Sequence, residues 1–236
     1  MKSTVLAIVQ QFCGEAGLPQ PPGLKGATDA NTKNLFAQIK RVLRELKMYK
    51  WPYANKRVSW VSVAGEDQGT ILSLFGADYR SIVADTFWDE TEQRPVVGPI
   101  ADANWEALKT SGVTGPYYSF TMKEGHVFIL PSLPAGHTMA VTYYSDYSVY
   151  DNLGVLKANV TEDDDTLIYD DDVVIPCLEW CWKKSKGEDW QDDRALWLSK
   201  VYQALGRDGG PVLQLDSPNN NARPGIIIPA GNWVLP

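Results

Sequence analysis

The chain of 236 residues is poor in histidine and cysteine, with two and three respectively. Three cysteines are too few, and odd in number, for a disulfide framework, so we expect synthesis in a reducing cytoplasm. No apolar run approaches the roughly 18–20 residues that a membrane helix needs, which predicts no membrane partner. Residues 1–13 carry a short apolar stretch with no small-residue cleavage site after it, so we expect no signal peptide.

The sequence also lacks the motifs of common catalytic and nucleotide-binding sites. No G-x-S-x-G, Walker A or G-x-G-x-x-G pattern occurs. Asp85 and Asp89 flank Trp88 in a way that would suit a sugar site with two carboxylates, but turn residues at a strand end are the favoured interpretation. We therefore expect no enzyme and no cofactor.

Two groups of residues resemble metal ligands and are better explained otherwise. Cys177 and Cys181 lie four positions apart on one face of a predicted helix. Structural zinc needs four nitrogen or sulfur ligands at short paired spacings, which His126 and His137 do not supply. We therefore predict buried core thiols.

An acidic run occupies residues 162–165 and 170–172. It lacks the central glycine of a calcium-binding loop, so we predict no metal there. Residues 170–172 directly precede a predicted helix, where acidic side chains cap free amides and favour the helix dipole. Helix capping and a solvated loop account for the run.

The formal net charge of −7 is unevenly distributed. Residues 1–60 hold ten basic and three acidic residues, which leaves twelve basic and twenty-six acidic residues in the remainder. Such asymmetry indicates contact with nucleic acid, with a membrane or with a partner of complementary charge. Pairing between neighbouring copies of the chain is the most economical explanation, because such a heterologous contact closes a ring.

Helical periodicity dominates both ends of the chain. Apolar residues recur at helical spacing in residues 1–13 and again from about residue 28, with Thr28 or Asp29 as the predicted cap, to residue 51. Two more helices are predicted over 173–186 and 189–207, joined at Gly187.

The middle of the chain changes to a period of two. From about residue 57 to 148 the pattern predicts about six strands, with a tight turn at Glu124–Gly125 and one short helix over residues 102–111. The last 25 or so residues are rich in Asn, Pro and Gly and cannot fold alone.

These patterns predict an α+β fold in which both chain ends form a helical bundle around an inserted antiparallel β domain. The expected divisions are the first part of the bundle, the β domain, an acidic linker with the helical hairpin that completes the bundle, and an extended C-terminal arm. Their boundaries are 1–55, 56–149, 150–210 and 211–236.

Several segments resemble a family of structural proteins of tailed phages, the head-to-tail adaptors (tail tubular or gatekeeper proteins) of short-tailed phages. The similar region covers about residues 27–207. The matching segments are AGEDQ at 64–68, DTFWD at 85–89, RPVVGPI at 94–100, WEALK at 105–109, GPYY at 115–118, LPSLPAG at 130–136, WCWK at 180–183 and KGED at 186–189.

The resemblance implies a structural virion protein of the phage neck and tail, with no catalytic residues. Such adaptors are made in the host cytoplasm and combine a helical bundle with an inserted β domain. They form a ring, commonly a dodecamer, beneath the portal protein. The ring extends the DNA channel, which the genomic DNA crosses without sequence-specific contact, and offers a docking platform to the tail nozzle or other tail proteins.

Two sets of residues are candidates for contacts in such an assembly. An apolar patch with a nearby tryptophan in the arm is the candidate contact with the portal or a neighbour: Ile226, Ile227, Ile228 and Trp233. Charged residues of the long helix and of the acidic run are candidates for the channel wall or the contact between subunits: Lys40, Arg41, Arg44, Lys47, Asp163, Asp164 and Asp165.

Two other functions remain open from the sequence. The nine tryptophans and the β-rich middle would suit a receptor- or carbohydrate-binding module of the tail, which needs two or three exposed, coplanar aromatic rings. A DNA-binding factor would instead track phosphates with the basic helix. An adaptor should bury most of the set Trp60, Trp88, Trp180 and Trp182.

Overall fold

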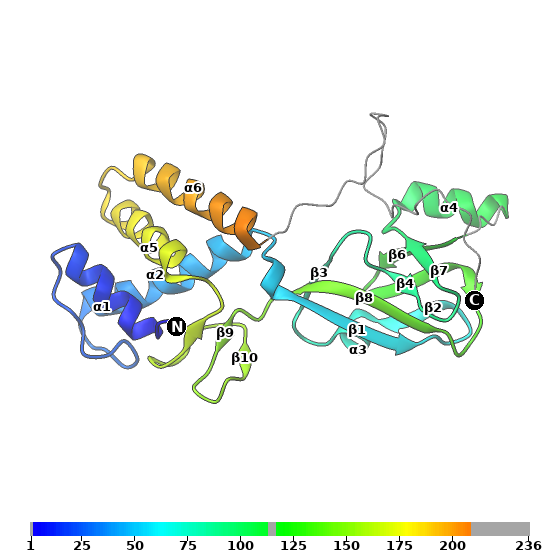
Figure 1. The fold of residues 1–236 in the computed structure, drawn as a ribbon, viewed down its shortest axis with the longest axis horizontal. Helices are drawn as coiled ribbons and strands as arrows, with labels where there is room; N and C mark the ends of the chain where they lie inside the picture. Colours follow the sequence, from blue (N-terminus) through cyan, green and yellow to red (C-terminus); the bar gives the residue numbers. More distant parts are fainter. Residues whose placement is uncertain (1, 113–116, 209–236) are drawn as a thin grey trace. The chain divides into compact units, whose positions relative to one another are not determined.

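The computed structural model describes residues 2–112 and 117–208. These residues form an α+β fold with six α-helices and a curled β-sheet, which confirms the predicted class (Figure 1). They divide into two compact units. The first unit holds residues 2–56 and 144–208, and the second holds 57–112 and 117–143.

Four α-helices belong to the first unit: α1 (Val5–Glu15), α2 (Ala30–Lys47), α5 (Asp171–Lys186) and α6 (Gln191–Asp208). Each forms where the periodicity predicted it, and two begin at residues that suit a cap. The Thr4 hydroxyl accepts a hydrogen bond from the amide of Ala7, and the Asp29 carboxylate accepts one from the amide of Thr32 at 2.8 Å. The predicted cap at Asp29 is therefore confirmed.

The acidic start of α5 differs from the prediction. Asp170 occupies the cap position but makes no side-chain cap bond, and its carboxylate pairs with Arg207 of α6 instead. Asp171 accepts a hydrogen bond from the Ser3 hydroxyl. Two long-range partners thus take the place of the predicted side-chain cap, whereas Asp171 and Asp172 do lie in the first turn of α5, where acidic residues favour the helix dipole.

A single apolar core joins the four helices of the first unit. α5 packs against α6, α2 and α1, and its buried residues 173–178 and 180–182 contribute on nearly every side. Trp51, just before a 3₁₀ turn (Pro52–Ala54), is buried there and donates its indole N–H to the Leu46 carbonyl at 2.8 Å. The buried apolar face of α2 packs against α5, and this contact holds together two segments that lie over 100 positions apart in the sequence.

A three-stranded antiparallel sheet lies in the stretch predicted to be an acidic linker. It contains β9 (Val149–Tyr150), β10 (Leu156–Lys157) and β11 (Thr166–Leu167) in the order β10-β9-β11. Apolar Val149 and Leu167 pair directly and are buried in the core of the first unit. The stretch is therefore folded against the helices.

The second unit carries most of the strands and two short helices. They are β1 (Asn55–Val61), β2 (Gly65–Thr70), α3 (Ile71–Phe75), β3 (Tyr79–Ile82), β4 (Trp88–Asp89), β5 (Arg94–Val97), α4 (Asp102–Ser111), β6 (Tyr118–Lys123), β7 (His126–Leu133) and β8 (Thr138–Ser145). The first residues of β1 and the last residues of β8 fall in the first unit.

The strand order is β1-β8-β4-β5-β6-β7-β2, with β3 also paired to β8. One pair contradicts the predicted antiparallel domain, because β5 and β6 are parallel, with Val96 opposite Tyr118. The chain between these strands includes α4, and a long connection with a helix is what a parallel pair requires. The predicted helix over 102–111 is confirmed. The sequence pattern did not indicate that this helix connects two parallel strands.

Alternation along β4 and β8 separates a core face from an outer face. Phe87, Met139, Val141 and Tyr143 are buried in the core of the second unit. Trp88 and Ala140 are cross-strand partners on the other side of the alternation. This outer face carries the pocket described below.

Candidate functional site

The candidate assembly charges on α2 mostly contact their own unit. The Lys40 ammonium lies 4.3 Å from the centre of the Phe36 ring, and the Arg41 guanidinium lies 5.5 Å from that of Trp180. Lys47 donates to the Ala158 carbonyl at 3.0 Å and pairs with Asp146 at 3.3 Å. Arg44 is exposed. Lys40 and Arg44 therefore present their charge to solvent, whereas Arg41 and Lys47 also pack within the unit.

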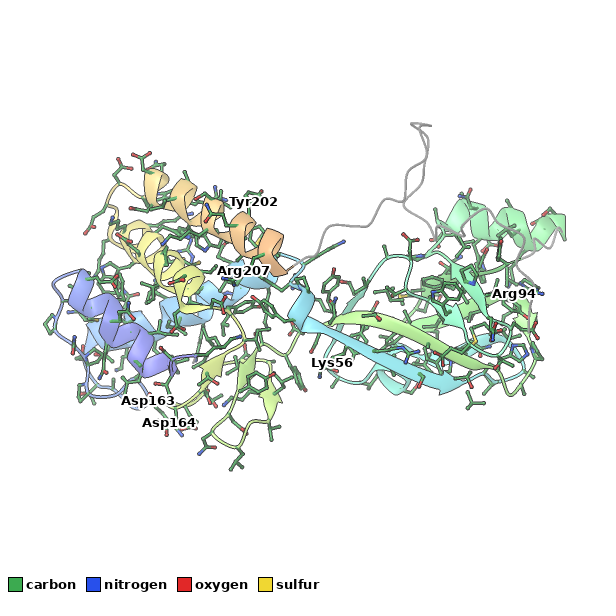
Figure 2. The ribbon with its side chains drawn as sticks, viewed as in Figure 1. Lys56, Arg94, Asp163, Asp164, Tyr202 and Arg207 are labelled. Carbon is green, nitrogen blue, oxygen red and sulfur yellow. The ribbon has the colours of Figure 1, made fainter. Side chains whose placement is uncertain are left out.

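The three acidic candidates are consecutive in the sequence but have different environments, and Figure 2 labels the first two of them, Asp163 and Asp164. Asp163 accepts hydrogen bonds from the amides of Leu24 and Lys25, at 3.0 and 2.9 Å. Asp164 is exposed. The Asp165 side chain is 1% exposed and pairs with Lys157 at 2.7 Å. Of the three, Asp164 is the one whose carboxylate faces solvent.

Burial alone would raise the pKa of Asp165. Hydrogen bonds from Lys157 and from the amides of Glu162 and Thr161 outweigh burial and hold the pKa below its ordinary value. The carboxylate therefore organises a loop of its own chain. This structural role does not fit a carboxylate on a channel wall.

Ile226, Ile227, Ile228 and Trp233 lie outside the described residues. Cys13, Cys177 and Cys181 are free, buried thiols, which confirms the prediction for the last two. Within residues 2–112 and 117–208, no group of three or more His, Cys, Asp or Glu side chains is placed to hold a metal ion. Over the same residues, no helix combines the length and hydrophobicity that crossing a membrane demands.

Of the four tryptophans whose burial would distinguish an adaptor from a sugar-binding module, two are buried and two are half-buried. Trp180 and Trp182 are buried in the first unit, whereas Trp60 and Trp88 of the second unit are half-buried. Trp60 packs its ring against Phe75 and Phe87 of the core. Trp88 is thus the member of this set that lines a pocket.

Asp89 is fully buried next to this pocket and cannot act as one of two sugar-site carboxylates. Its Oδ2 atom lies 2.7 Å from Nδ1 of His137, and its Oδ1 atom accepts the amides of Thr91 and Glu92 at 2.9 and 3.2 Å. Asp85 is exposed and has a positive φ of 58°. The interpretation of both as turn residues is therefore correct, and the pair of carboxylates does not form.

The pocket has a volume of about 290 Å³ and is lined by Arg57, Thr86, Trp88, Glu90, Gln93 and Ala140. All six residues belong to the second unit. The guanidinium of Arg57 and the carboxylate of Glu90 form an ion pair at the pocket, and both side chains are largely exposed. Trp88 was singled out from the sequence, but the contributions of β1 and β8 depend on strand pairing.

Gln93 lines the pocket in a conformation that side chains disfavour. Its φ of 54° lies in the left-handed region, which costs roughly 1–2 kcal/mol for a residue with a Cβ atom. A strained backbone conformation persists only where the surrounding structure holds it in place. Such conformations are concentrated at functional sites. The sequence did not indicate this residue, because glutamine is not one of the residue types that commonly adopt a left-handed backbone.

Comparison of the chain with protein-family models and with curated protein sequences finds no match in either case.

Proposed function

We propose that the protein is a head-to-tail connector adaptor, a structural virion protein without enzymatic activity. The proposal rests on the segments that resemble short-tailed phage adaptors. In the finer arrangement that we propose, both chain ends form a helical bundle, the β domain is an insertion, and residues 211–236 form an extended arm.

The division of the chain is the observation that carries the proposal. Residues 2–56 and 144–208 build one mainly helical unit, and residues 57–112 and 117–143 build a sheet unit. This is the arrangement that the resemblance implies for an adaptor. A protein with one compact sheet and no helical partner would instead suit a simple binding module.

In the proposed mechanism, copies of the helical unit pack side by side into a ring beneath the portal, with twelve copies expected. The ring extends the channel for genomic DNA, and the β domain contacts neighbours or the tail nozzle. Among the candidate residues, exposed Lys40 and Arg44 of one copy and exposed Asp164 of another can form contacts between copies. Since exposed charge pairs are screened by salt, ring formation should weaken as salt increases.

The arm provides the contact with the portal in this proposal. Ile226, Ile227, Ile228 and Trp233 are its apolar residues, and a segment that orders on docking can wrap a large surface. Deletion of residues 216–236 should leave the two units folded and abolish attachment to the portal. Normal particle assembly by the truncated protein would refute this role.

A direct test mixes the purified protein with the portal protein and measures the mass of the product. A ring of defined stoichiometry on the portal is the expected result, and images of purified particles should place it between head and tail. Absence of any complex at low salt, with both proteins folded, would overturn the proposal.

The second candidate is a receptor- or carbohydrate-binding module of the tail. Its specific support is the half-buried indole of Trp88 beside polar side chains. The described pocket contains one aromatic side chain, whereas a module that grips a glycan chain uses two or three. The adaptor role is therefore preferred for the whole protein.

A further inference from the structure

The pocket beside β4 has a floor that leaves room for a small ligand. Ala140 of β8 lies directly opposite Trp88 of β4 in the sheet register. The alanine side chain ends at Cβ and is only 2% exposed, so it forms the base of the pocket that Trp88 also lines. This pairing of a small and a large residue produces the hollow of about 290 Å³.

The polar groups of the pocket provide both donors and acceptors without net charge. The Arg57 guanidinium supplies donors, the Glu90 carboxylate supplies acceptors, and the Gln93 amide supplies both. Because Arg57 and Glu90 pair with each other, their charges cancel. A neutral ligand rich in hydroxyl groups can bond both partners at once, whereas a charged ligand gains no net electrostatic attraction from a pair whose charges cancel.

The turn that carries Glu90 and Gln93 is fixed before any ligand arrives. Buried Asp89 accepts the amides of Thr91 and Glu92 and is hydrogen-bonded to His137. The Glu90 amide donates to the Thr138 carbonyl, and the Thr138 amide donates to the Thr91 hydroxyl, both at 2.8 Å. Pre-organisation of this kind lowers the entropic cost of binding.

We propose that this pocket binds one ring of a neutral saccharide. The C–H face of the ring would lie against the Trp88 indole, whose face carries partial negative charge. Its hydroxyl groups would bond Arg57, Glu90 and Gln93. The volume is at the low end for small-molecule sites, which restricts the ligand to about one ring. This proposal is independent of the adaptor role.

The test uses saturation-transfer NMR on the full chain with methyl glycosides of glucose, galactose, mannose and N-acetylglucosamine as probes. At least one probe should bind with a dissociation constant in the millimolar range, since one shallow ring site offers few contacts. Absence of binding by all four probes would overturn the proposal. Tighter binding of glucuronate or glucosamine than of the neutral sugars would also overturn it.

Three variants locate the binding. Trp88→Ala removes the stacking face and should weaken binding about tenfold or more, and Glu90→Gln, an exposed change that keeps the shape, should weaken it several-fold. Ala140→Leu should fill the hollow and abolish binding. Tyr202→Ala, which removes an exposed aromatic ring of α6, is the matched control and should leave binding unchanged (Figure 2).

The folded state of each variant is checked by its circular dichroism and thermal transition. If Ala140→Leu fails to fold, Glu90→Gln and Trp88→Ala still decide the matter. Binding that survives both of those changes would place the saccharide elsewhere and refute the proposed pocket. If no sugar binds and Trp88→Ala instead prevents assembly of the particle, the pocket receives a protein side chain and the saccharide proposal is wrong.

Discussion

The ammonium of Lys157 lies 2.7 Å from the carboxylate of Asp165, whose side chain is almost completely buried. The second oxygen of the same carboxylate accepts the amides of Thr161 and Glu162, at 2.8 and 2.9 Å. One acidic side chain thereby closes a turn and joins it to β10. The acidic run is in this respect an internal structural element of the first unit.

Replacing this carboxylate should destabilise the protein at neutral pH. For Asp165→Asn we expect a loss of about 2–3 kcal/mol in the free energy of unfolding at pH 7, because a charge-assisted bond is removed inside the protein. The measurement is urea unfolding of the variant and the wild type.

The same substitution should change the dependence on pH. The folded-state pKa of Asp165 is lowered, so its stabilisation is present above the ordinary pKa of about 3.9 and is lost as pH falls through the folded value. The difference between wild type and Asp165→Asn should therefore shrink below about pH 4. An equal difference at pH 7 and pH 3 would contradict this account.

The environment of Tyr143 leads us to expect that the folded protein loses stability at high pH. The single hydroxyl proton of Tyr143 is shared between the Phe75 carbonyl and the Asp78 carboxylate, each 3.0 Å from the hydroxyl oxygen. Burial, and then the bond to Asp78, raise the pKa of Tyr143 to about 12. Since the raised pKa favours the neutral form, the stabilisation is complete below the unfolded value of about 10 and is lost as pH rises through about 12.

The Tyr143→Phe variant tests this assignment. It should cost about 1–3 kcal/mol at pH 7, because it leaves two acceptors without this donor, and it should flatten the alkaline loss of stability. Guanidinium unfolding at pH 8 and pH 11 provides the comparison. An unchanged alkaline profile in the variant would assign the loss to other tyrosines.

Trp180 is the residue on which the core of the first unit should depend most. Its ring lies 5.9 Å from that of Trp190 and 5.6 Å from that of Trp197, and it is 1% exposed. Trp180→Ala should cost about 3–5 kcal/mol, the usual range for a large aromatic in a core.

The matched control is Tyr202→Ala, because the Tyr202 side chain is 65% exposed on the neighbouring helix α6. It should change the free energy of unfolding by no more than about 0.5 kcal/mol. Thermal unfolding, followed by the helical circular dichroism signal, measures both variants. Similar losses in the two variants would argue against the packing described for α5 and α6.

Gly98 should tolerate no side chain. A Cβ atom at this position would lie 2.5 Å from the backbone oxygen of Phe120, and the φ of Gly98 is 151°. Gly98→Ala should therefore cost at least about 2 kcal/mol, because a backbone atom of β6 would have to move. Chemical unfolding of the purified variant measures the loss.

Gly112 provides the matched control for this substitution. Its φ of 61° is also positive, but among the described residues no atom would lie within 4 Å of a Cβ placed there. Gly112→Ala should cost only about 1 kcal/mol, the conformational term alone. A loss as large as that of Gly98→Ala would show that the clash with Phe120 contributes little.

The helices could be predicted because their signals are local. Asp29 caps α2 and apolar residues repeat along it, and residues 102–111 form the predicted helix α4. The strand set was predicted less completely. β4 has only two residues, and such a short strand carries no period of its own.

The candidate site was only partly visible in the sequence. Trp88 was recognised as a potential sugar contact, and its partner Asp89 was correctly interpreted as a turn residue. Arg57, Gln93 and Ala140 were not identified, because they reach the pocket through strand pairing and a left-handed backbone. Neither feature follows from residue type alone.

The sequence by itself determined the α+β class, the positions of the main helices and the identity of the buried thiols, since short-range periodicity and capping control these features. The tertiary structure decided which charges remain at the surface. Lys47 and Asp165 were candidates for contacts between subunits, yet each binds a partner in its own unit. Lys47 pairs with Asp146, which is distant in sequence, and Asp165 pairs with Lys157, which a turn brings close. Strand order likewise follows from burial of one face of each strand against segments far along the chain, which no local pattern encodes.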